Sequence, residues 1–256
     1  MTLWFKESGD QANKKIIFLH GLLASAQNWQ IVSKRMSHEY HTFCLDLPNH
    51  GHSVHSDHAD YEYMLDEFIN FIEHMQFEKF HLVGHSMGGK LAMLYALRYP
   101  EKIEALVIED IAPKTYPKRY LPLMQAMHDL ELSQFKNRLE IDRALEEKVS
   151  DKALRLFLLT NLEKKIDHYQ WRVNLHSLIR HADSLMSFPS CSDNYEKDAL
   201  FLCGAESEYV KDTDKVLISK LFPQCNIYHI EGASHWLHAE KPDVFSTYIK
   251  SYFEKF

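Results

Sequence analysis

The sequence predicts an α/β protein whose mostly parallel sheet is flanked by helices on both faces. Apolar runs of strand length alternate with longer segments of helical periodicity, which is the pattern of repeated βαβ units. The alternation breaks down between Ile111 and about Asp198, where helical patterns rich in charge, Leu and Met take over. It then returns and ends in an amphipathic segment from Pro242 to Phe253, and Pro is a favourable first-turn residue.

Six strands are expected from the apolar runs. They lie near Lys15–Leu19, Thr42–Leu45, Phe80–Gly84, Ala105–Glu109, Leu200–Cys203 and Asn226–Ile230. The segment Tyr61–Met75 places its apolar residues on one stripe, which predicts a helix packed against the sheet. A second helix should follow Ser86 and stop near Tyr99, because Pro100 disfavours helical geometry in the residue before it.

Length and composition favour one α/β domain with an insertion. The chain has 256 residues and 45% hydrophobic content, which is enough to bury one large core. No repeat or flexible linker sets the helical segment apart. We therefore expect a core of residues 1–110 and 199–256, and a helical cap (lid) over residues 111–198.

Charge and cysteine content narrow the partners and the compartment. The formal net charge of -7 provides no global positive field, so neither nucleic acid nor an anionic membrane is an expected partner. The first residues lack the pattern of a signal peptide, and no stretch approaches the length that spans a bilayer. The four cysteines form no C-x-x-C pair and are expected to be reduced. These features predict a cytoplasmic protein.

The segment Gly84–Gly88, with the sequence GHSMG, places Ser86 at the centre of a nucleophile elbow. It follows the apolar run Phe80–Val83 and opens a helical segment, which is the strand, turn and helix context that the G-x-S-x-G motif requires. Small residues are needed around such a tight turn, and glycine supplies them. We therefore expect Ser86 to be a nucleophile.

A serine hydroxyl needs a base, and His235 is the predicted one. Histidine has the pKa that suits this proton transfer. His235 follows the last predicted strand and precedes the terminal helix. The rivals are His229, inside that strand, and His238, three residues later, and both are better explained as structural or surface residues.

Two backbone N–H groups are expected to stabilise the oxyanion of an attacked carbonyl. The first belongs to Leu22, in the loop beyond the pair His20–Gly21. The second belongs to Met87, at the start of the helix after the nucleophile, where free N–H groups favour negative charge. His20 itself is interpreted as an organiser of the loop.

No metal or organic cofactor is expected. The histidines His50, His52, His55 and His58 crowd one loop, but they lack paired helical spacing, cysteine partners and a carboxylate placed as in known zinc motifs. We therefore interpret them as solvated or packed side chains.

Together these motifs resemble those of α/β hydrolases, and among them the YbfF-type esterases. The resemblance covers core and cap and rests on Leu19–Leu22, Asp46–Ser53, Gly84–Lys90, Asp110–Pro113, Trp171–Leu175 and Gly232–Trp236. It implies an α/β-hydrolase fold, a helical cap between the sixth and seventh strands, no cofactor, and activity on acyl esters or acyl-thioesters.

A catalytic triad also needs an acid that orients the histidine, and here the chain departs from the common pattern of the fold. Where an acid usually follows the seventh strand, this chain has Ser207. Asp110 is the predicted substitute, because it ends the apolar run 105–108 and parallel strands bring their carboxyl ends to one edge of the sheet. Glu206 and Glu208 are the alternatives if their longer side chains fold back.

Substrate contacts are predicted from Trp236, beside His235, and from Met124 and Met127 in the cap. The two methionines offer an adaptable apolar surface for an acyl chain, although they are equally well explained as the cap's own core. Lys114, like its cationic neighbours, is a weaker candidate for contact with an anionic leaving group.

The predicted activity is hydrolysis of small acyl esters or acyl-CoA thioesters through an acyl-enzyme on Ser86. The expected partner is thus a small-molecule substrate, and the sequence fixes no oligomeric state. Two alternatives stay open: a carbon–carbon bond hydrolase or lyase of the same fold, marked by basic groups in its pocket, and a catalytically silent binding module.

Overall fold

The computed structural model describes residues 3–256 and contains one seven-stranded sheet in the order β1-β3-β2-β4-β5-β8-β9. Strand β1 pairs with β3 in antiparallel orientation, and every other neighbouring pair of this sheet is parallel. The strands are β1 Phe5–Ser8, β2 Lys15–Leu19, β3 His41–Leu45, β4 Phe80–His85, β5 Ile103–Glu109, β8 Ala199–Gly204 and β9 Cys225–Ile230.

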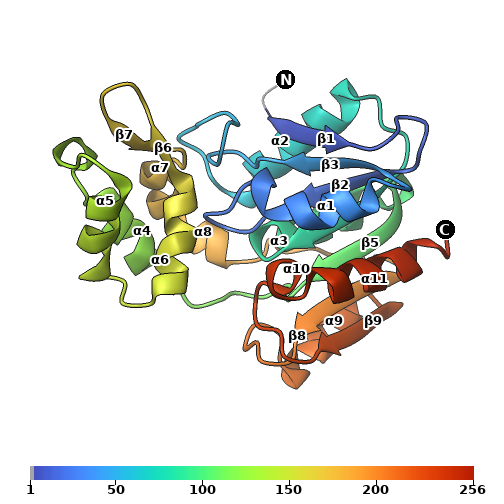
Figure 1. The fold of residues 1–256 in the computed structure, drawn as a ribbon. Helices are drawn as coiled ribbons and strands as arrows, with labels where there is room; N and C mark the ends of the chain where they lie inside the picture. Colours follow the sequence, from blue (N-terminus) through green and yellow to red (C-terminus); the bar gives the residue numbers. More distant parts are fainter. Residues whose placement is uncertain (1–2) are drawn as a thin grey trace.

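Helices cover both faces of this sheet, as Figure 1 shows. One face packs against α1, α10 and α11, and the other against α2, α3 and α9. Strands β3 and β4 are buried along their whole length, which is why they read as continuous apolar runs. The core helices are α1 Gln30–Met36, α2 Tyr61–His74, α3 Met87–Arg98, α9 Lys215–Leu221, α10 Leu237–Glu240 and α11 Pro242–Phe253.

The segment between β5 and β8 leaves the sheet and forms the helical body at one end of the molecule in Figure 1. It contains α4 Leu121–His128, α5 Arg138–Glu146, α6 Lys152–Leu158, α7 Leu175–Arg180 and α8 Ala182–Met186. It also contains a short antiparallel hairpin of β6 Leu162–Lys164 and β7 Tyr169–Trp171. One-turn 3₁₀ helices lie at Ala26–Trp29, Pro100–Lys102, Leu132–Gln134, Leu159–Asn161 and Asp212–Asp214.

Most elements lie where the sequence predicts them, and the differences are two short elements and the place where the cap leaves the sheet. The strand β1 and the hairpin β6–β7 were not predicted, because strands of three or four partly exposed residues carry no apolar run. The cap segment leaves after β5, which is the fifth strand along the described chain and not the sixth.

Hydrogen bonds fix the cap to the core at several separate places. Asn174 of the cap donates from Nδ2 to Oδ1 of the fully buried Asn49, at 2.9 Å, and Asn161 donates to the carbonyl of Leu23, at 2.8 Å. Among the helices of residues 3–256, none is both long enough and apolar enough to cross a bilayer.

Candidate active site

Ser86 lies on a sharp turn between β4 and α3. Its backbone has φ 51° and ψ -114°, a strained conformation for a residue with a side chain. The turn is possible because its neighbours are small: a Cβ on Gly84 would lie 2.4 Å from the carbonyl oxygen of Gly88. The strand, turn and helix arrangement is therefore the one expected for a nucleophile elbow.

His235 is buried and is oriented by Asp110. Its Nδ1 lies 2.7 Å from Oδ2 of Asp110, and its Nε2 has no hydrogen-bond partner within the described chain. The ring of Tyr209 stacks on the imidazole, with centroids 3.6 Å apart and planes 10° apart. A carboxylate at Nδ1 places the ring proton there and leaves Nε2 free to accept a proton.

Asp110 is held by groups at the end of β8 and on the loop after it. It follows β5 with φ 49°, its amide donates to the carbonyl of Leu202, and its Oδ1 accepts the amide of Gly204 at 3.1 Å. Its Oδ2 also accepts a hydrogen bond from the hydroxyl of Ser207. The loop that usually supplies the acid in this fold thus supplies donors to Asp110 instead.

The two glutamates that were alternatives to Asp110 point elsewhere. Glu206 is exposed, and Glu208 is exposed and pairs with Arg119 at 3.3 Å. Glu109 lies on the opposite face of β5, as alternation along a strand requires, where it contacts His238 at 2.9 Å. Of these carboxylates, the structure brings Asp110 to His235.

The loop after β2 presents Leu22 beside the elbow. Leu22 and Met87 line the same cavity as Ser86, and no hydrogen bond engages either backbone N–H within the described chain. His20 accepts the amide of Leu47 on Nε2 at 2.9 Å, so it organises the loop as predicted. Burial lowers the pKa of His20 to about 4, which keeps this acceptor neutral.

A cavity of about 240 Å³ opens at Ser86 between the core and the cap. Besides Ser86, Leu22 and Met87, its wall consists of Tyr61, Lys90, Ile111, Lys114, Thr115, Tyr116, Pro117, Arg119, Tyr120, Leu185, Met186, Glu208, Tyr209 and Lys211. Its size suits a small acyl group with part of a leaving group.

Met124, Met127 and Trp236 do not line this cavity. Met124 and Met127 are fully buried and belong to the apolar interior of the cap, where α4 packs against α7. Trp236 is half-buried and packs against Phe157 of α6, with ring centroids 5.7 Å apart. The apolar cavity wall comes instead from aromatic residues at 116, 120 and 209.

Lys90 is a buried cation in the cavity wall, one turn after Ser86. Its Nζ donates to the carbonyls of Met186 and Ser187, at 2.7 and 2.8 Å, where α8 of the cap ends. It also lies 4.9 Å from the ring centre of Tyr116. Burial, aided by the nearby charge of Lys114, lowers the pKa of Lys90 to about 7.

A second buried network supports His235 from behind. Nε2 of His85 donates to the carbonyl of His235 at 2.9 Å, and Nδ1 of His238 donates to Glu109.

Two groups of side chains in the described chain have the composition of a metal site. One is His85, Glu109 and His238, and the other is His58, Asp60 and His181.

Sequence reasoning missed two residues of the site. Tyr209 reaches His235 through an irregular loop, and no periodicity marks its position. Lys90 had a usable signal, because a lysine inside an otherwise apolar helix start demands a buried partner.

Comparison with known proteins agrees with this geometry. The family model described as "alpha/beta hydrolase fold" matches residues 14–140. The chain is 36% identical over 252 residues to the sn-1-specific diacylglycerol lipase ABHD11 of Mus musculus, covering 95% of this chain and 82% of that protein. The chain belongs to the α/β-hydrolase family.

Two further relatives of this α/β hydrolase are esterases. Esterase YbfF of Escherichia coli (strain K12) is 28% identical over 241 residues, covering 94% of this chain and 93% of that protein. A solved structure described as a marine microorganism esterase is 34% identical, with a TM-score of 0.94 and 98% of both chains covered. The predicted resemblance to YbfF-type esterases is thereby confirmed.

Proposed function

We propose that this α/β hydrolase is a serine esterase or thioesterase that hydrolyses small acyl esters or acyl-CoA thioesters. The observation that carries the proposal is the contact of Asp110 with Nδ1 of His235, on the sheet edge that presents Ser86 to the cavity. The esterase and lipase relatives support hydrolysis of a carboxylic ester.

In the proposed mechanism, Oγ of Ser86 attacks the carbonyl carbon while Nε2 of His235 takes the hydroxyl proton. The resulting oxyanion accepts hydrogen bonds from the amides of Leu22 and Met87. The tetrahedral species collapses, the C–O or C–S bond breaks, and His235 returns its proton to the departing alcohol or thiol.

Water then completes the cycle. His235 takes a proton from water, the hydroxide attacks the acyl-enzyme carbonyl, and Ser86 leaves with that proton as the acid is released. Asp110 stabilises the imidazolium in both halves of the cycle. The free Nε2 of His235 supports this role, because a buried nitrogen without a partner can accept the proton of Ser86.

The cavity wall favours small acyl groups over a specific CoA contact. Lys114 pairs with Asp214, Lys118 lies 2.9 Å from Asp183, and Arg119 pairs with Glu208. Since each of these cations already has a carboxylate, a dedicated phosphate site at the cavity entrance has little support. An acyl-CoA substrate would use them only by displacing these pairs.

A carbon–carbon bond hydrolase is the second candidate, and one observation favours it. The cavity carries the basic groups that such an enzyme would use to hold a carboxylate, and among residues 3–256 neither Lys90 nor Lys211 pairs with a carboxylate. Lys90, however, already donates to two carbonyls of the cap. A silent binding module is less well supported, because a buried carboxylate contacts Nδ1 of His235 and Ser86 lies on a strained turn in the cavity wall.

We also propose a reducing compartment such as the cytoplasm, and a small molecule as the partner in catalysis. All four cysteines are free, and Cys44 and Cys203 are buried. Buried free thiols are the pattern of proteins from reducing compartments.

The test is a substrate panel assayed with the wild-type enzyme and Ser86→Ala. The panel contains p-nitrophenyl esters and acyl-CoA thioesters of graded chain length. Two further substrates carry a carboxylate: a p-nitrophenyl hemisuccinate, which is an ester, and a 1,3-diketone acid, which only a carbon–carbon bond hydrolase would cleave. We expect turnover of short neutral esters that falls by about 10⁶ in Ser86→Ala. Turnover confined to the diketone would establish the second candidate.

A further inference from the structure

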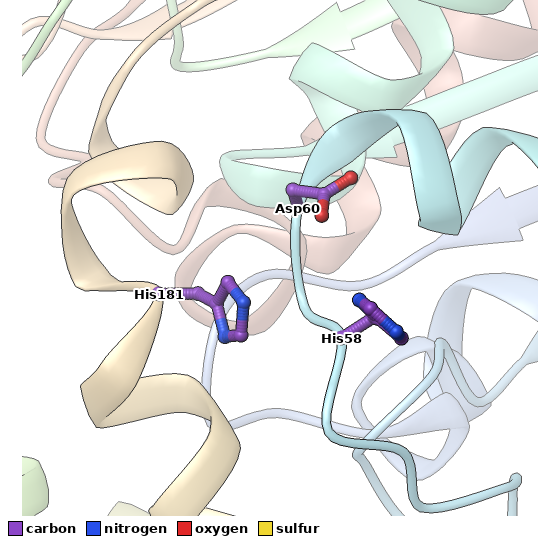
Figure 2. Close-up of side chains that lie close together, drawn as sticks. All are labelled: His58, Asp60 and His181. Carbon is purple, nitrogen blue, oxygen red and sulfur yellow. The ribbon is translucent and has the colours of Figure 1, made fainter.

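We propose that His58, Asp60 and His181 form a site for Zn²⁺ that joins the core to the cap. We call these three residues the bridging site. Figure 2 shows the His181 ring, at the junction of α7 and α8, directed toward the loop before α2 that carries His58 and Asp60. One ligand atom from each residue lies within 4.8 Å of those of the other two.

Each residue of the bridging site has one ligand atom to offer. Nδ1 of His181 lies 3.0 Å from the carbonyl of Ser177, and because a carbonyl only accepts, Nδ1 carries the proton and Nε2 is an unprotonated ligand. A hydrogen bond on the far nitrogen is the usual way that proteins orient a metal-binding histidine. His181 is therefore already in the tautomer that binds a metal.

Asp60 and His58 also each have an atom free to bind a metal ion. One oxygen of Asp60 accepts the amide of Tyr63 at 2.9 Å, which caps α2 and leaves the other oxygen free. The ring of His58 makes no hydrogen bond to any part of the chain that the structure describes, and the residue is exposed. The carboxylate is thus anchored, whereas the His58 ring can turn toward an ion.

This donor set fits zinc in number and kind. Two imidazole nitrogens and one carboxylate oxygen are ligands that Zn²⁺ prefers, and a water would complete a tetrahedron. Zinc ligands about 2.0 Å from the ion lie roughly 3.3 Å apart, so separations of up to 4.8 Å need to shorten by at most about 1.5 Å. Rotation of the exposed His58 ring supplies most of this closure.

The other cluster of suitable composition does not offer a comparable site. His85, Glu109 and His238 are buried, and most of their polar atoms already have partners. Nε2 of His85 donates to the carbonyl of His235, and Glu109 accepts from Nδ1 and the backbone amide of His238, whereas Nε2 of His238 is left without a partner in the described chain. The bridging site, in contrast, is partly exposed and can exchange an ion with solvent.

A bound ion at the bridging site would hold one wall of the cavity in place. Asp60 directly precedes Tyr61, and His181 directly precedes α8, which contributes Leu185 and Met186 to the cavity. The hydroxyl of Tyr61 donates to the carbonyl of Leu185 at 3.1 Å. The effect on catalysis rests on the proposed function, but the binding of zinc does not.

The test is isothermal titration of the EDTA-treated full chain with Zn²⁺, together with thermal unfolding. We expect one site per chain and a rise in Tm of about 5 °C when zinc exceeds its Kd by roughly 100-fold. His58→Ala, His181→Ala and Asp60→Asn should each weaken binding by roughly tenfold or more. Asn is a good N-cap, so Asp60→Asn preserves the start of α2.

Two controls separate this site from other histidines. His176→Ala removes an exposed histidine of α7 outside the bridging site, and His235→Ala removes the proposed base. Both should bind zinc like the wild type, whatever their esterase activity. Equal loss in His176→Ala, undiminished binding in all three site variants, or no binding by the wild type would overturn the proposal.

Discussion

The hydroxyl of Ser207 donates a hydrogen bond to Oδ2 of Asp110, the same oxygen that faces Nδ1 of His235. Ser207 occupies the loop position where the fold usually carries its acid. The chain has thus moved the negative charge from the end of β8 to the end of β5 and kept a neutral donor at the former place. Ser207 and His235 thus share one oxygen of Asp110, which places the former acid position next to the carboxylate that contacts the imidazole.

The first prediction concerns the identity of the acid. Asp110→Asn conserves shape but removes the charge that stabilises the imidazolium, so kcat for a short p-nitrophenyl ester should fall by about 10⁴. Glu206→Gln and Glu208→Gln should stay near the wild-type rate, since neither side chain reaches His235. Near-normal turnover in Asp110→Asn beside collapse in either glutamine variant would show that the acid is a glutamate.

The second prediction is a positional rescue. In the Asp110→Asn background, Ser207→Asp should recover roughly tenfold or more of the lost kcat, because it places a carboxylate on the residue whose side chain contacts the oxygen of Asp110 that faces Nδ1. Ser207→Ala in the same background is the matched control and should recover nothing. Equal rates in the two double variants would mean that the loop position cannot serve His235.

The third prediction concerns Lys90, whose ammonium holds the carboxyl end of α8 against α3. Lys90→Met keeps the apolar stem but leaves two carbonyls without their donor, so the free energy of unfolding should fall by about 2 kcal/mol. We expect a higher KM with a smaller change in kcat, since the cavity wall loosens while the triad stays intact. Lys118→Met, which breaks only an exposed pair, is the control.

Wild-type stability and KM in Lys90→Met would show that the cap needs no such tether. Urea unfolding and steady-state kinetics on a short ester provide both measurements.

The fourth prediction is a loss of stability in acid. Burial, reinforced by the neighbouring His20, lowers the pKa of His50 to about 3, below its ordinary value of 6.5. Between these values the unfolded chain binds a proton that the folded chain does not, so stability falls as pH drops below 6.5. His50 alone should cost about 3 kcal/mol at pH 4.5.

Urea unfolding from pH 7.5 to 4.5 measures this loss. In His50→Gln the decline should be shallower, because glutamine does not titrate, while the exposed His55→Gln should follow the wild-type curve. Parallel curves for all three proteins would contradict the assignment of this loss to His50.

The long elements of this fold were predictable because their patterns are local. The helix Pro242–Phe253 and the strand Lys15–Leu19 lie at their predicted bounds, since apolar periodicity and an N-terminal proline mark them directly. The hairpin at residues 162–171 was not predictable, because its strands are short and partly exposed.

In the site, too, contiguous motifs were predictable from the sequence, whereas contacts between distant parts of the chain were not. The turn at Ser86 is visible in the sequence, because the motif is contiguous. The proximity of His58 and Asp60 to His181 is not visible in the sequence, because His181 belongs to the cap and lies far along the chain. The contact of Tyr209 with His235 likewise depends on how an irregular loop folds over the sheet edge.

Covalent labelling tests whether Ser86 is the nucleophile. The wild-type enzyme is treated with a fluorophosphonate, digested, and analysed by mass spectrometry, with Ser86→Ala and His235→Ala in parallel. We expect one adduct on the peptide that contains Ser86, none in Ser86→Ala, and strongly slowed labelling in His235→Ala. An unlabelled wild-type enzyme, or an adduct on a different serine, would contradict this assignment.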